Sequence, residues 1–213
     1  MVMDDIVSIT LFRHGITKEN LEKRYIGWTD VSIDMNSLNE VRIPTLERSF
    51  QKVFSSDLKR CVETACLLVP GSTIIKDSRL RELHFGEWER KTYNDLKDQK
   101  EYQQWLRAPF LLTTPKGEAY TQLETRVLEF WKELITVFEN EETKNVLLIT
   151  HGGPIRFLLT YFSPKESKKD WWEWSIEHFC GYTLSWNRKN LLKGGSSCTS
   201  SLVEPFMVKR TGL

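Results

Sequence analysis

Six short apolar runs along the chain have the pattern of β-strands. Ile6–Phe12 (IVSITLF) and Val146–Ile149 (VLLI) are almost continuously apolar, which is typical of strands buried on both faces. The predicted strands are Ile6–Phe12, Val53–Ser55, Ile74–Ile75, Val146–Ile149, Tyr182–Trp186 and Leu202–Val208.

Segments with apolar residues at helical spacing lie between these strands. The predicted helices are Leu58–Val69, Thr92–Arg107, Thr121–Asn140 and Ile155–Tyr161. Pro70-Gly71 end the first helix, and Pro154 suits the first turn of the last one. The tract Gly194–Ser201 (GGSSCTSS) is expected to be a surface loop. Strands that alternate with helices predict an α/β fold, with an open, largely parallel sheet and helices on both faces.

The composition describes a folded protein with nearly balanced charge. A chain of 213 residues suits a single domain, 1–213, and 40% hydrophobic residues with 12% aromatic residues exclude intrinsic disorder. Lys plus Arg (30) and Asp plus Glu (29) leave a formal net charge of +1. This balance argues against a nucleic-acid or membrane-surface binder, and no apolar stretch approaches the ~18 residues of a membrane span.

The start of the chain and its cysteines predict a cytoplasmic protein. Met1–Asp5 is acidic and unlike a signal peptide. The cysteines form no CxxC pair, and Cys61 and Cys66 are spaced so that their side chains diverge on a predicted helix. Reduced thiols in the cytoplasm are the simplest interpretation.

Polar residues follow three of the predicted strands, at the point where each strand ends. Arg13–Gly15 follows the first strand, Ser55–Asp57 with Arg60 follows the second, and His151–Gly153 follows the VLLI strand. Open α/β sheets place ligands at the carboxyl ends of their strands. We therefore expect these side chains to form one site.

Two histidines and two arginines at this site favour a multiply charged oxyanion, above all phosphate. Taken singly, His14 or His151 would more often be a structural residue, and Arg13 or Arg60 a surface ion pair. A metal site would need a third ligand, and neither HxH nor HExxH spacing occurs. Arginines would also repel a cation, so the prediction is that no metal binds.

Arg13-His14-Gly15 within RHGITKEN resembles the opening signature of the histidine phosphatase superfamily, which is also called phosphoglycerate-mutase-like. RHG alone is a weak signal, but further blocks follow in the family's order and rough spacing. These blocks are Arg24–Asp30 (RYIGWTD), Ser55–Leu58 with Arg60 and Glu63–Ala65, Leu80–Glu89 (LRELHFGEWE), Pro115 with Gly117-Glu118, and Thr150–Arg156 (THGGPIR). The resemblance implies a three-layer α/β/α sandwich around a mostly parallel sheet.

The resemblance also implies roles for individual residues. His14 would be the nucleophile that is transiently phosphorylated, and Arg13, Arg60 and His151 would hold the phosphoryl oxygens. Amides near Gly15 and the side chain of Asn20 would add hydrogen bonds. The implied phosphate-binding set is Arg13, Gly15, Thr17, Asn20, Gly27, Arg60, Glu82, His151 and Gly152. No metal or other cofactor is implied.

Glu82 occupies the position of the family's general acid, which would protonate the leaving oxygen and then activate water. The alternative is that Glu82 only pairs with Arg79 or Arg81. We interpret Glu87 and Glu89 as packing or surface groups. The segment Gly27–Asp30 is expected either to line the entrance of the site or to be an ordinary turn.

The chain departs from the family's common pattern at three positions. Asn39 and Arg90 stand where many members have glycine, and Ala119 stands where serine is frequent. None of these belongs to the implied catalytic set, but they leave the identity of the substrate open.

The resemblance favours a phosphatase that acts on a small phosphorylated metabolite over a cofactor-dependent phosphoglycerate mutase. Such mutases carry a longer segment, rich in arginine and proline, which grips the second charged end of a bisphosphoglycerate. Here Lys91–Thr114 contains only one arginine, Arg107. The string HGGPIR is similar to α-ribazole phosphatases and broad-specificity phosphatases, which is a weak discriminator. A non-catalytic scaffold role is disfavoured because His14, Arg13, Arg60, Glu82 and His151 are all present.

Aromatic residues in the last third of the chain leave two interpretations open. Trp171–Trp174 (WWEW) would either pack an apolar or aromatic leaving group at the rim of the site, or belong to a core or homodimer contact. His178 is expected to have a structural role.

Overall fold

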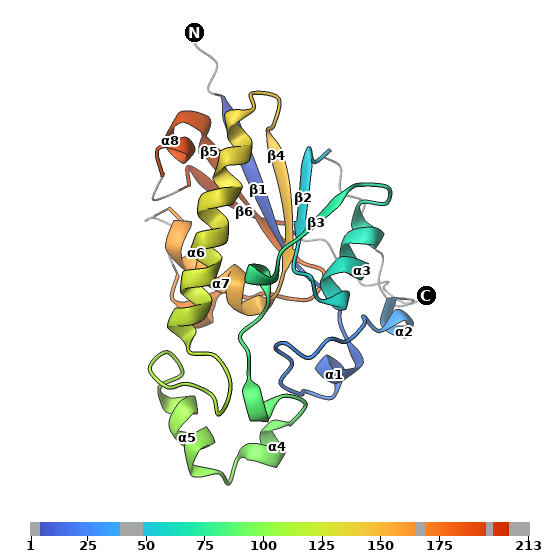
Figure 1. Cartoon of the computed structure of the whole chain (residues 1–213), viewed down its shortest axis with the longest axis vertical. Coiled ribbons are helices and arrows are strands. Elements are labelled where there is room, and N and C mark those ends of the chain that lie inside the picture. The colour runs from blue at the N-terminus through green and yellow to red at the C-terminus, as the bar shows by residue number, and fades with distance from the viewer. Residues whose placement is uncertain (1–4, 39–48, 165–168, 195–197, 205–213) are drawn as a thin grey trace, which may run out of the picture.

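The computed structural model describes residues 5–38, 49–164, 169–194 and 198–204, and it centres on one mixed β-sheet (Figure 1). The strands are β1 (Ile6–Arg13), β2 (Lys52–Ser55), β3 (Ile74–Lys76), β4 (Asn145–Thr150), β5 (Gly181–Asn187) and β6 (Ser200–Glu204). Within the described residues they lie in the order β3-β2-β4-β1-β5-β6. The first four strands in this order are parallel, and β5 runs antiparallel to both β1 and β6.

Helices pack against both faces of the sheet. The α-helices are α1 (Lys18–Leu21), α2 (Met35–Leu38), α3 (Lys59–Leu68), α4 (Tyr93–Leu96), α5 (Lys100–Arg107), α6 (Tyr120–Thr136), α7 (Gly152–Phe162) and α8 (Arg188–Leu192). The 3₁₀ turns are η1 (Ser78–Leu80), η2 (Gly86–Trp88), η3 (Val137–Glu139) and η5 (Trp171–Glu173). Segments α1, α4 and α5 extend beyond the carboxyl ends of the parallel strands (Figure 1).

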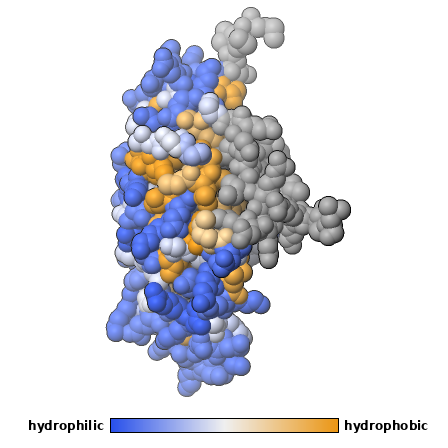
Figure 2. Space-filling model, turned by 90° about the vertical axis from the view of Figure 1, so that its right-hand side faces the viewer, coloured by the Kyte–Doolittle hydropathy of each residue, from blue (hydrophilic) through white to orange (hydrophobic). Residues whose placement is uncertain are grey.

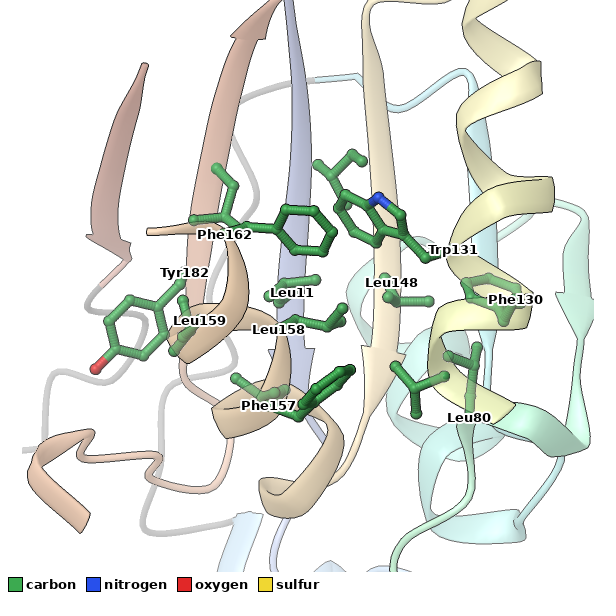
Figure 3. Close-up of a cluster of buried hydrophobic side chains, with 14 of the residues drawn as sticks. Leu11, Leu80, Phe130, Trp131, Leu148, Phe157, Leu158, Leu159, Phe162 and Tyr182 are labelled. Atoms are coloured by element: carbon green, nitrogen blue, oxygen red, sulfur yellow. The ribbon is translucent and has the colours of Figure 1, made fainter. Parts of the chain in front are cut away.

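The strand alternation sends neighbouring side chains into two separate cores. Leu147 and Ile149 pack with Ala65 of α3, whereas Val146 and Leu148 pack in the larger core with α6 and α7. Figure 3 shows Phe130 and Trp131 of α6 beside Leu148, with Phe157 and Phe162 of α7 across the same sheet face. The three-layer α/β/α sandwich around a mostly parallel sheet is thus confirmed.

Thr92–Arg107 is not one helix, as the apolar spacing predicts, but two short ones. Helix α4 begins at Thr92 with a capping box and ends after one turn, and α5 starts anew at Lys100. The Gln103 side chain donates a hydrogen bond to the Lys97 carbonyl at 2.8 Å, which satisfies a backbone group at the break. The intervening residues Asp98 and Gln99 are polar, so a continuous helix would bury no further apolar side chain there.

The predicted loop Gly194–Ser201 is partly wrong, because β6 begins at Ser200. Ser200 pairs with Ser185 of β5, and the Thr199 hydroxyl donates to the Ser185 carbonyl. Backbone pairing with an open strand edge outweighs the turn-forming side chains here. The strand predicted at Leu202–Val208 is described only up to Glu204, and residues 205–208, Asn39 and Met1–Asp4 lie outside the described residues.

On the side of α3 and β3, hydrophobic residues gather across the middle of the molecular face (Figure 2). A shallow groove of about 500 Å³ is lined there by Ile33, Met35, Val62 and Leu67. No helix in the described part of the chain is long and apolar enough to span a membrane.

Candidate active site

The carboxyl ends of β2, β4 and β1 lie next to one another because these three strands are neighbours in the sheet. Arg13 pairs in register with Thr150, and Ser55 pairs with Ile149. The residues that directly follow, His14, Ser56 and His151, are therefore brought to one edge, as the sequence predicts.

His14 is a buried neutral imidazole with a defined tautomer. Its side chain is only 4% exposed, and Nδ1 lies 2.6 Å from the Gly15 carbonyl oxygen. A carbonyl can only accept, so Nδ1 carries the proton and Nε2 keeps its lone pair. Burial, reinforced by the positive charge of Arg60, holds the pKa of His14 well below its ordinary value. His14 is thus chemically able to act as a nucleophile through Nε2.

Arg13 presents a buried donor without a partner in the described protein. One Nη donates to the Ile176 carbonyl at 2.5 Å, but its Nε has no hydrogen-bond partner. Burial lowers the pKa of Arg13 to about 10, so it remains a cation near neutral pH. A buried guanidinium N–H without an acceptor is stabilised by an arriving anion.

Arg60 is held by backbone carbonyls around the site. It is 1% exposed, and its two Nη atoms donate to the Gly27 carbonyl at 2.7 Å and to the Thr29 carbonyl at 2.9 Å. Gly27, which the sequence places in the phosphate-binding set, therefore contacts Arg60 through its carbonyl. Burial lowers the pKa of Arg60 as well.

His151 begins α7 as its N-cap residue and is completely buried. Its Nδ1 accepts from Arg60 Nε at 3.3 Å, which leaves the proton on Nε2, and Nε2 lies 3.0 Å from the Ser56 hydroxyl. The Cys61 sulfur is also 3.4 Å from Nε2. Burial and the charge of Arg60 lower the pKa of His151. Both ring nitrogens thus contact protein groups. Ser56 is among the residues that the sequence predicts at this edge, whereas Cys61 is a partner that sequence reasoning missed.

Gly15 follows His14 where a larger residue would not fit. A Cβ at this position would overlap the ring of Phe179, which has a left-handed backbone (φ 56°). The Gly15 amide donates to Thr64 Oγ1 at 2.9 Å, so this amide is engaged within the protein rather than held open for a ligand.

Thr17 and Asn20 form a reciprocal capping box at the start of α1. The Thr17 amide donates to Asn20 Oδ1 at 3.1 Å, and the Asn20 amide donates to Thr17 Oγ1 at 3.2 Å. Thr17 is fully buried. These contacts use Thr17 Oγ1 and Asn20 Oδ1 to position the loop after His14.

Glu82 lies at the beginning of α7, on the same side as the histidines. Its Oε2 accepts from the Gly153 amide at 3.0 Å, and its Oε1 accepts from the Leu83 amide at 2.9 Å. A Cβ at Gly153 would overlap Glu82 Oε1, so the glycine is needed for this approach. Burial lowers the pKa of Arg13 and of Arg156, and the negative charge of Glu82 partly opposes that lowering.

The alternative partners of Glu82 are engaged elsewhere. Arg79 pairs with Asp77 at 2.6 Å and with Glu133 at 2.7 Å, and Arg81 pairs with Asp57 at 2.5 Å. The carboxylate of Glu82 therefore faces the helix terminus and the site rather than either of these arginines.

Glu87 and Glu89 have the packing and surface positions expected of them. Glu87 forms an exposed ion pair with Lys116 at 2.5 Å. Glu89 accepts from the amides of Trp28 and Thr29, at 2.7 Å and 2.6 Å. Trp28 itself donates through its indole to the Glu82 carbonyl at 2.9 Å, so the Gly27–Asp30 segment forms a wall against the site.

Arg156 and His178 are site neighbours that sequence reasoning did not assign to the site. A Cβ at Gly152 would lie 3.3 Å from Arg156 Nη1 and 3.8 Å from Arg13, so Gly152 leaves space between two guanidiniums. His178 donates from Nδ1 to the His14 carbonyl at 3.1 Å, and its ring centroid is 5.1 Å from that of His14. Burial lowers the pKa of His178 to about 3.

The Trp171–Trp174 segment divides between the core and the site. Trp174 is buried in the larger core, whereas Trp171 and Trp172 line a cavity of about 340 Å³ that also borders Glu82, Gly153 and Arg156. The sequence left these two interpretations open, and each describes part of the segment. Within the described residues, no group of three or more His, Cys, Asp or Glu side chains could hold a metal ion.

A neutral imidazole, buried guanidinium groups and a nearby carboxyl thus lie together at the strand ends of an α/β sandwich, and groups of these kinds are chemically able to bind a phosphoryl group. The profile of the histidine phosphatase superfamily (branch 1) matches residues 9–192, and the chain belongs to this superfamily. Members of it act on small phosphorylated substrates.

Relatives of this chain carry two different activities. A 2,3-bisphosphoglycerate-dependent phosphoglycerate mutase 2 of Gloeobacter violaceus is 32% identical over 76% of this chain and 79% of its own. An adenosylcobalamin/alpha-ribazole phosphatase of Escherichia coli is 25% identical over 84% of this chain and 90% of its own. The crystal structure of the alpha-ribazole phosphatase from Shigella flexneri superimposes with a TM-score of 0.71, at 21% identity, over 97% of this chain and 99% of that one.

Proposed function

We propose that this protein is a metal-independent phosphomonoesterase that hydrolyses a small phosphorylated metabolite through a phosphohistidine on His14. Glu82 is the general acid and base, and Arg13 and Arg60 hold the phosphoryl oxygens. The observation that carries the proposal is the tautomer of His14, whose Nδ1–H faces the Gly15 carbonyl and leaves the Nε2 lone pair available.

In the first half-reaction, His14 Nε2 attacks phosphorus and the ester P–O bond breaks. The attacking imidazole gains positive charge as the N–P bond forms, and the short hydrogen bond from Nδ1 to Gly15 O stabilises this charge. Glu82, in its acid form, gives its proton to the leaving oxygen. The unpartnered Nε of Arg13 and the remaining N–H groups of Arg60 bind the equatorial oxygens, where negative charge is spread in the transition state.

In the second half-reaction, the carboxylate of Glu82 takes a proton from water, and the water oxygen attacks phosphorus. The P–N bond breaks, inorganic phosphate leaves, and His14 returns to its neutral state. His151 acts on both steps through Arg60, whose Nε donates to His151 Nδ1. We therefore assign His151 the role of positioning Arg60.

We prefer hydrolysis to mutase action because the segment Lys91–Thr114 lines the cavity beside Glu82 with uncharged side chains. This segment folds into α4 and α5, and Trp105, Leu106 and Phe110 from it line the cavity beside Glu82. These side chains offer no positive charge to a second anionic group of a bisphosphorylated substrate. The phosphatase relative supports hydrolysis, whereas the mutase relative keeps phosphoglycerate mutase as the second candidate.

A single domain spanning 1–213, a cytoplasmic location and a homodimer remain predictions. The Cys66 thiol is exposed and forms no disulfide, which fits a reducing compartment.

The test is release of inorganic phosphate from a panel of phosphomonoesters in the presence of EDTA. The panel contains p-nitrophenyl phosphate, 3-phosphoglycerate, sugar phosphates, nucleotides and α-ribazole phosphate. We expect turnover that EDTA does not reduce and that falls at least about 10³-fold in His14→Ala. Glu82→Gln is expected to lose about 10²- to 10⁴-fold in kcat, and Glu87→Gln, an exposed carboxyl of the same segment, to lose nothing.

Three outcomes would contradict the proposal. Activity that requires a metal would overturn the site assignment. Efficient interconversion of phosphoglycerates with a bisphosphoglycerate primer, faster than hydrolysis, would establish the mutase instead. Unchanged activity in His14→Ala would exclude the phosphohistidine.

A further inference from the structure

The cavity is lined by one of the proposed catalytic groups, Glu82. Glu82, Gly153 and Arg156 border it at one end, and Gly153 donates its amide to the Glu82 carboxylate. Its volume of about 340 Å³ is roughly eleven times the ~30 Å³ that one water molecule occupies in the liquid. A group bonded to the phosphoryl oxygen that Glu82 protonates would extend into this space.

Aromatic side chains form the far wall of this cavity. The ring of Phe110 lies 4.8 Å from Tyr120 and 6.0 Å from Trp172, and Tyr120 lies 4.9 Å from Trp171, between ring centroids. The edge-to-face contacts of Tyr120 fix its ring and that of Trp171. Trp172, by contrast, is 67% exposed while it also lines the cavity. A flat ligand that stacked there would remove apolar surface from water.

Charge is scarce in the cavity. Of its described lining residues, Glu82 is the one acidic residue and Arg156 is the one basic residue, and each lies beside a glycine at the start of α7. Burial raises the pKa of Tyr25 and of Tyr120, so the two phenols in the wall stay neutral. A carboxylate or second phosphate would find no cation deep in the cavity, and a sugar would find few partners for its hydroxyls.

We propose that the alcohol released by this enzyme carries an uncharged aromatic ring system, and that Phe110 and Trp172 determine this preference. The inference rests on the proposed phosphomonoesterase function and names its substrate class. The ring enters the cavity while the ester oxygen stays at Glu82. The balance of the reaction is unchanged: water and the phosphomonoester give the aromatic alcohol and inorganic phosphate.

The test compares 2-(1-naphthyl)ethyl phosphate with ethyl phosphate. Both release a primary alkoxide, so the intrinsic reactivity of the ester is similar and the ratio of kcat/KM measures the cavity. Burying an aromatic group of this size predicts a preference of roughly 10- to 150-fold for the naphthyl ester. 3-Phosphoglycerate, which has no ring to pack against the aromatic side chains of the cavity, is expected to be a poorer substrate than the naphthyl ester.

Variants assign the preference to the cavity wall. Trp172→Ala and Phe110→Ala are expected to lower kcat/KM for the naphthyl ester about tenfold and to leave ethyl phosphate unchanged. Trp172 is largely exposed, so its truncation spares the core. Tyr161→Ala is the matched control, since Tyr161 is 52% exposed and does not line the cavity. Tyr161→Ala should leave kcat/KM unchanged for both esters.

Failure of this inference is distinguishable from failure of the proposed function. Equal kcat/KM for the two esters would overturn the aromatic substrate class while leaving the phosphomonoesterase intact. A preference that survives in both Trp172→Ala and Phe110→Ala would overturn the assignment of these residues. If neither ester is hydrolysed, binding of the naphthyl ester to His14→Ala is measured by calorimetry. Binding would support the aromatic ligand class without turnover, and absence of binding would overturn it.

Discussion

Arg13 and Arg188 both have guanidinium nitrogens inside the protein, but these nitrogens have very different partners. Arg188 donates to the Asp5 carboxylate and to the carbonyls of Phe138 and Asn140. Arg13 has one carbonyl partner, Ile176, and a buried Nε without any. The partners of a satisfied buried cation offset its loss of hydration, whereas a buried guanidinium N–H without a partner is costly and is stabilised by an anion. Burial alone therefore does not distinguish the two roles, but the hydrogen bonds do.

Gly153→Ala should displace the Glu82 carboxylate without removing it, and so tests whether the position of this carboxylate matters for kcat. The added Cβ would overlap Glu82 Oε1, and we expect kcat to fall about 10- to 100-fold while the urea midpoint changes little. Phosphate release and urea unfolding measure the two effects. If Gly153 acts through Glu82, the double variant Gly153→Ala/Glu82→Gln is no slower than Glu82→Gln alone. Additive losses would contradict this coupling.

The protonation state of His14 gives a second prediction at this scale. Because burial and Arg60 lower its pKa, His14 should remain neutral as the pH falls through 6.5, the ordinary histidine value, and should gain a proton only at lower pH. Side-chain ¹⁵N NMR, assigned with His14→Gln, should show protonated Nδ1 and unprotonated Nε2 at pH 6.5. A titration midpoint at or above 6.5, or the opposite tautomer, would contradict the nucleophile geometry.

At the scale of elements, the strand ends were predictable because continuous apolar runs define where each buried strand stops. β1, β2 and β4 all end within one residue of the predicted position. Arg156 was within reach of sequence reasoning, since it follows Gly152 by four residues and therefore shares its face of α7. His178 was not, because the antiparallel pairing of β5 with β1, at Gly181 and Phe12, brings it beside His14.

The break between α4 and α5 was also missed because it depends on a side-chain contact that the apolar pattern does not show. Apolar spacing continues across it, and the Gln103 side chain that satisfies the Lys97 carbonyl gives no periodic signal. The role of Cys61 beside His151 likewise depends on where α3 lies against β4, which no local pattern specifies. Local sequence thus predicts which element a residue occupies more readily than which partner it meets across the fold.

Contact between α6 and α7 is expected to carry much of the stability of one sheet face. Trp131 of α6 stacks on Phe162 of α7 with ring centroids 4.3 Å apart, and it is 5% exposed. Trp131→Ala should therefore lower the free energy of unfolding by about 3–5 kcal/mol, measured by urea denaturation. Trp172→Ala removes the same side chain from an exposed position and should cost less than about 0.5 kcal/mol. Similar losses in both variants would contradict the assignment of Trp131 to the core.

For the whole molecule, the near balance of charge hides a strongly uneven distribution. The formal net charge is +1, yet Arg13, Arg60 and Arg156 lie together at the carboxyl end of the parallel strands. Burial lowers the pKa of each of these guanidinium groups, which means that their charged forms are less favourable in the fold than in water. This arrangement predicts that anion binding is coupled to the stability of the entire domain.

Inorganic phosphate should therefore raise the melting temperature of the protein. At a concentration one hundred times its Kd, a ligand that binds only the folded state adds about 2.7 kcal/mol, which corresponds to roughly 5–10 °C for a domain of this size. Differential scanning calorimetry at constant ionic strength, with sodium chloride as the reference, measures the shift. In Arg13→Met the shift should vanish, whereas in Arg79→Met, which removes an arginine paired with Asp77 and Glu133, it should persist. An equal shift in both variants would mean that phosphate binds elsewhere, because the unpartnered Nε of Arg13 is the group through which the buried site gains a hydrogen bond.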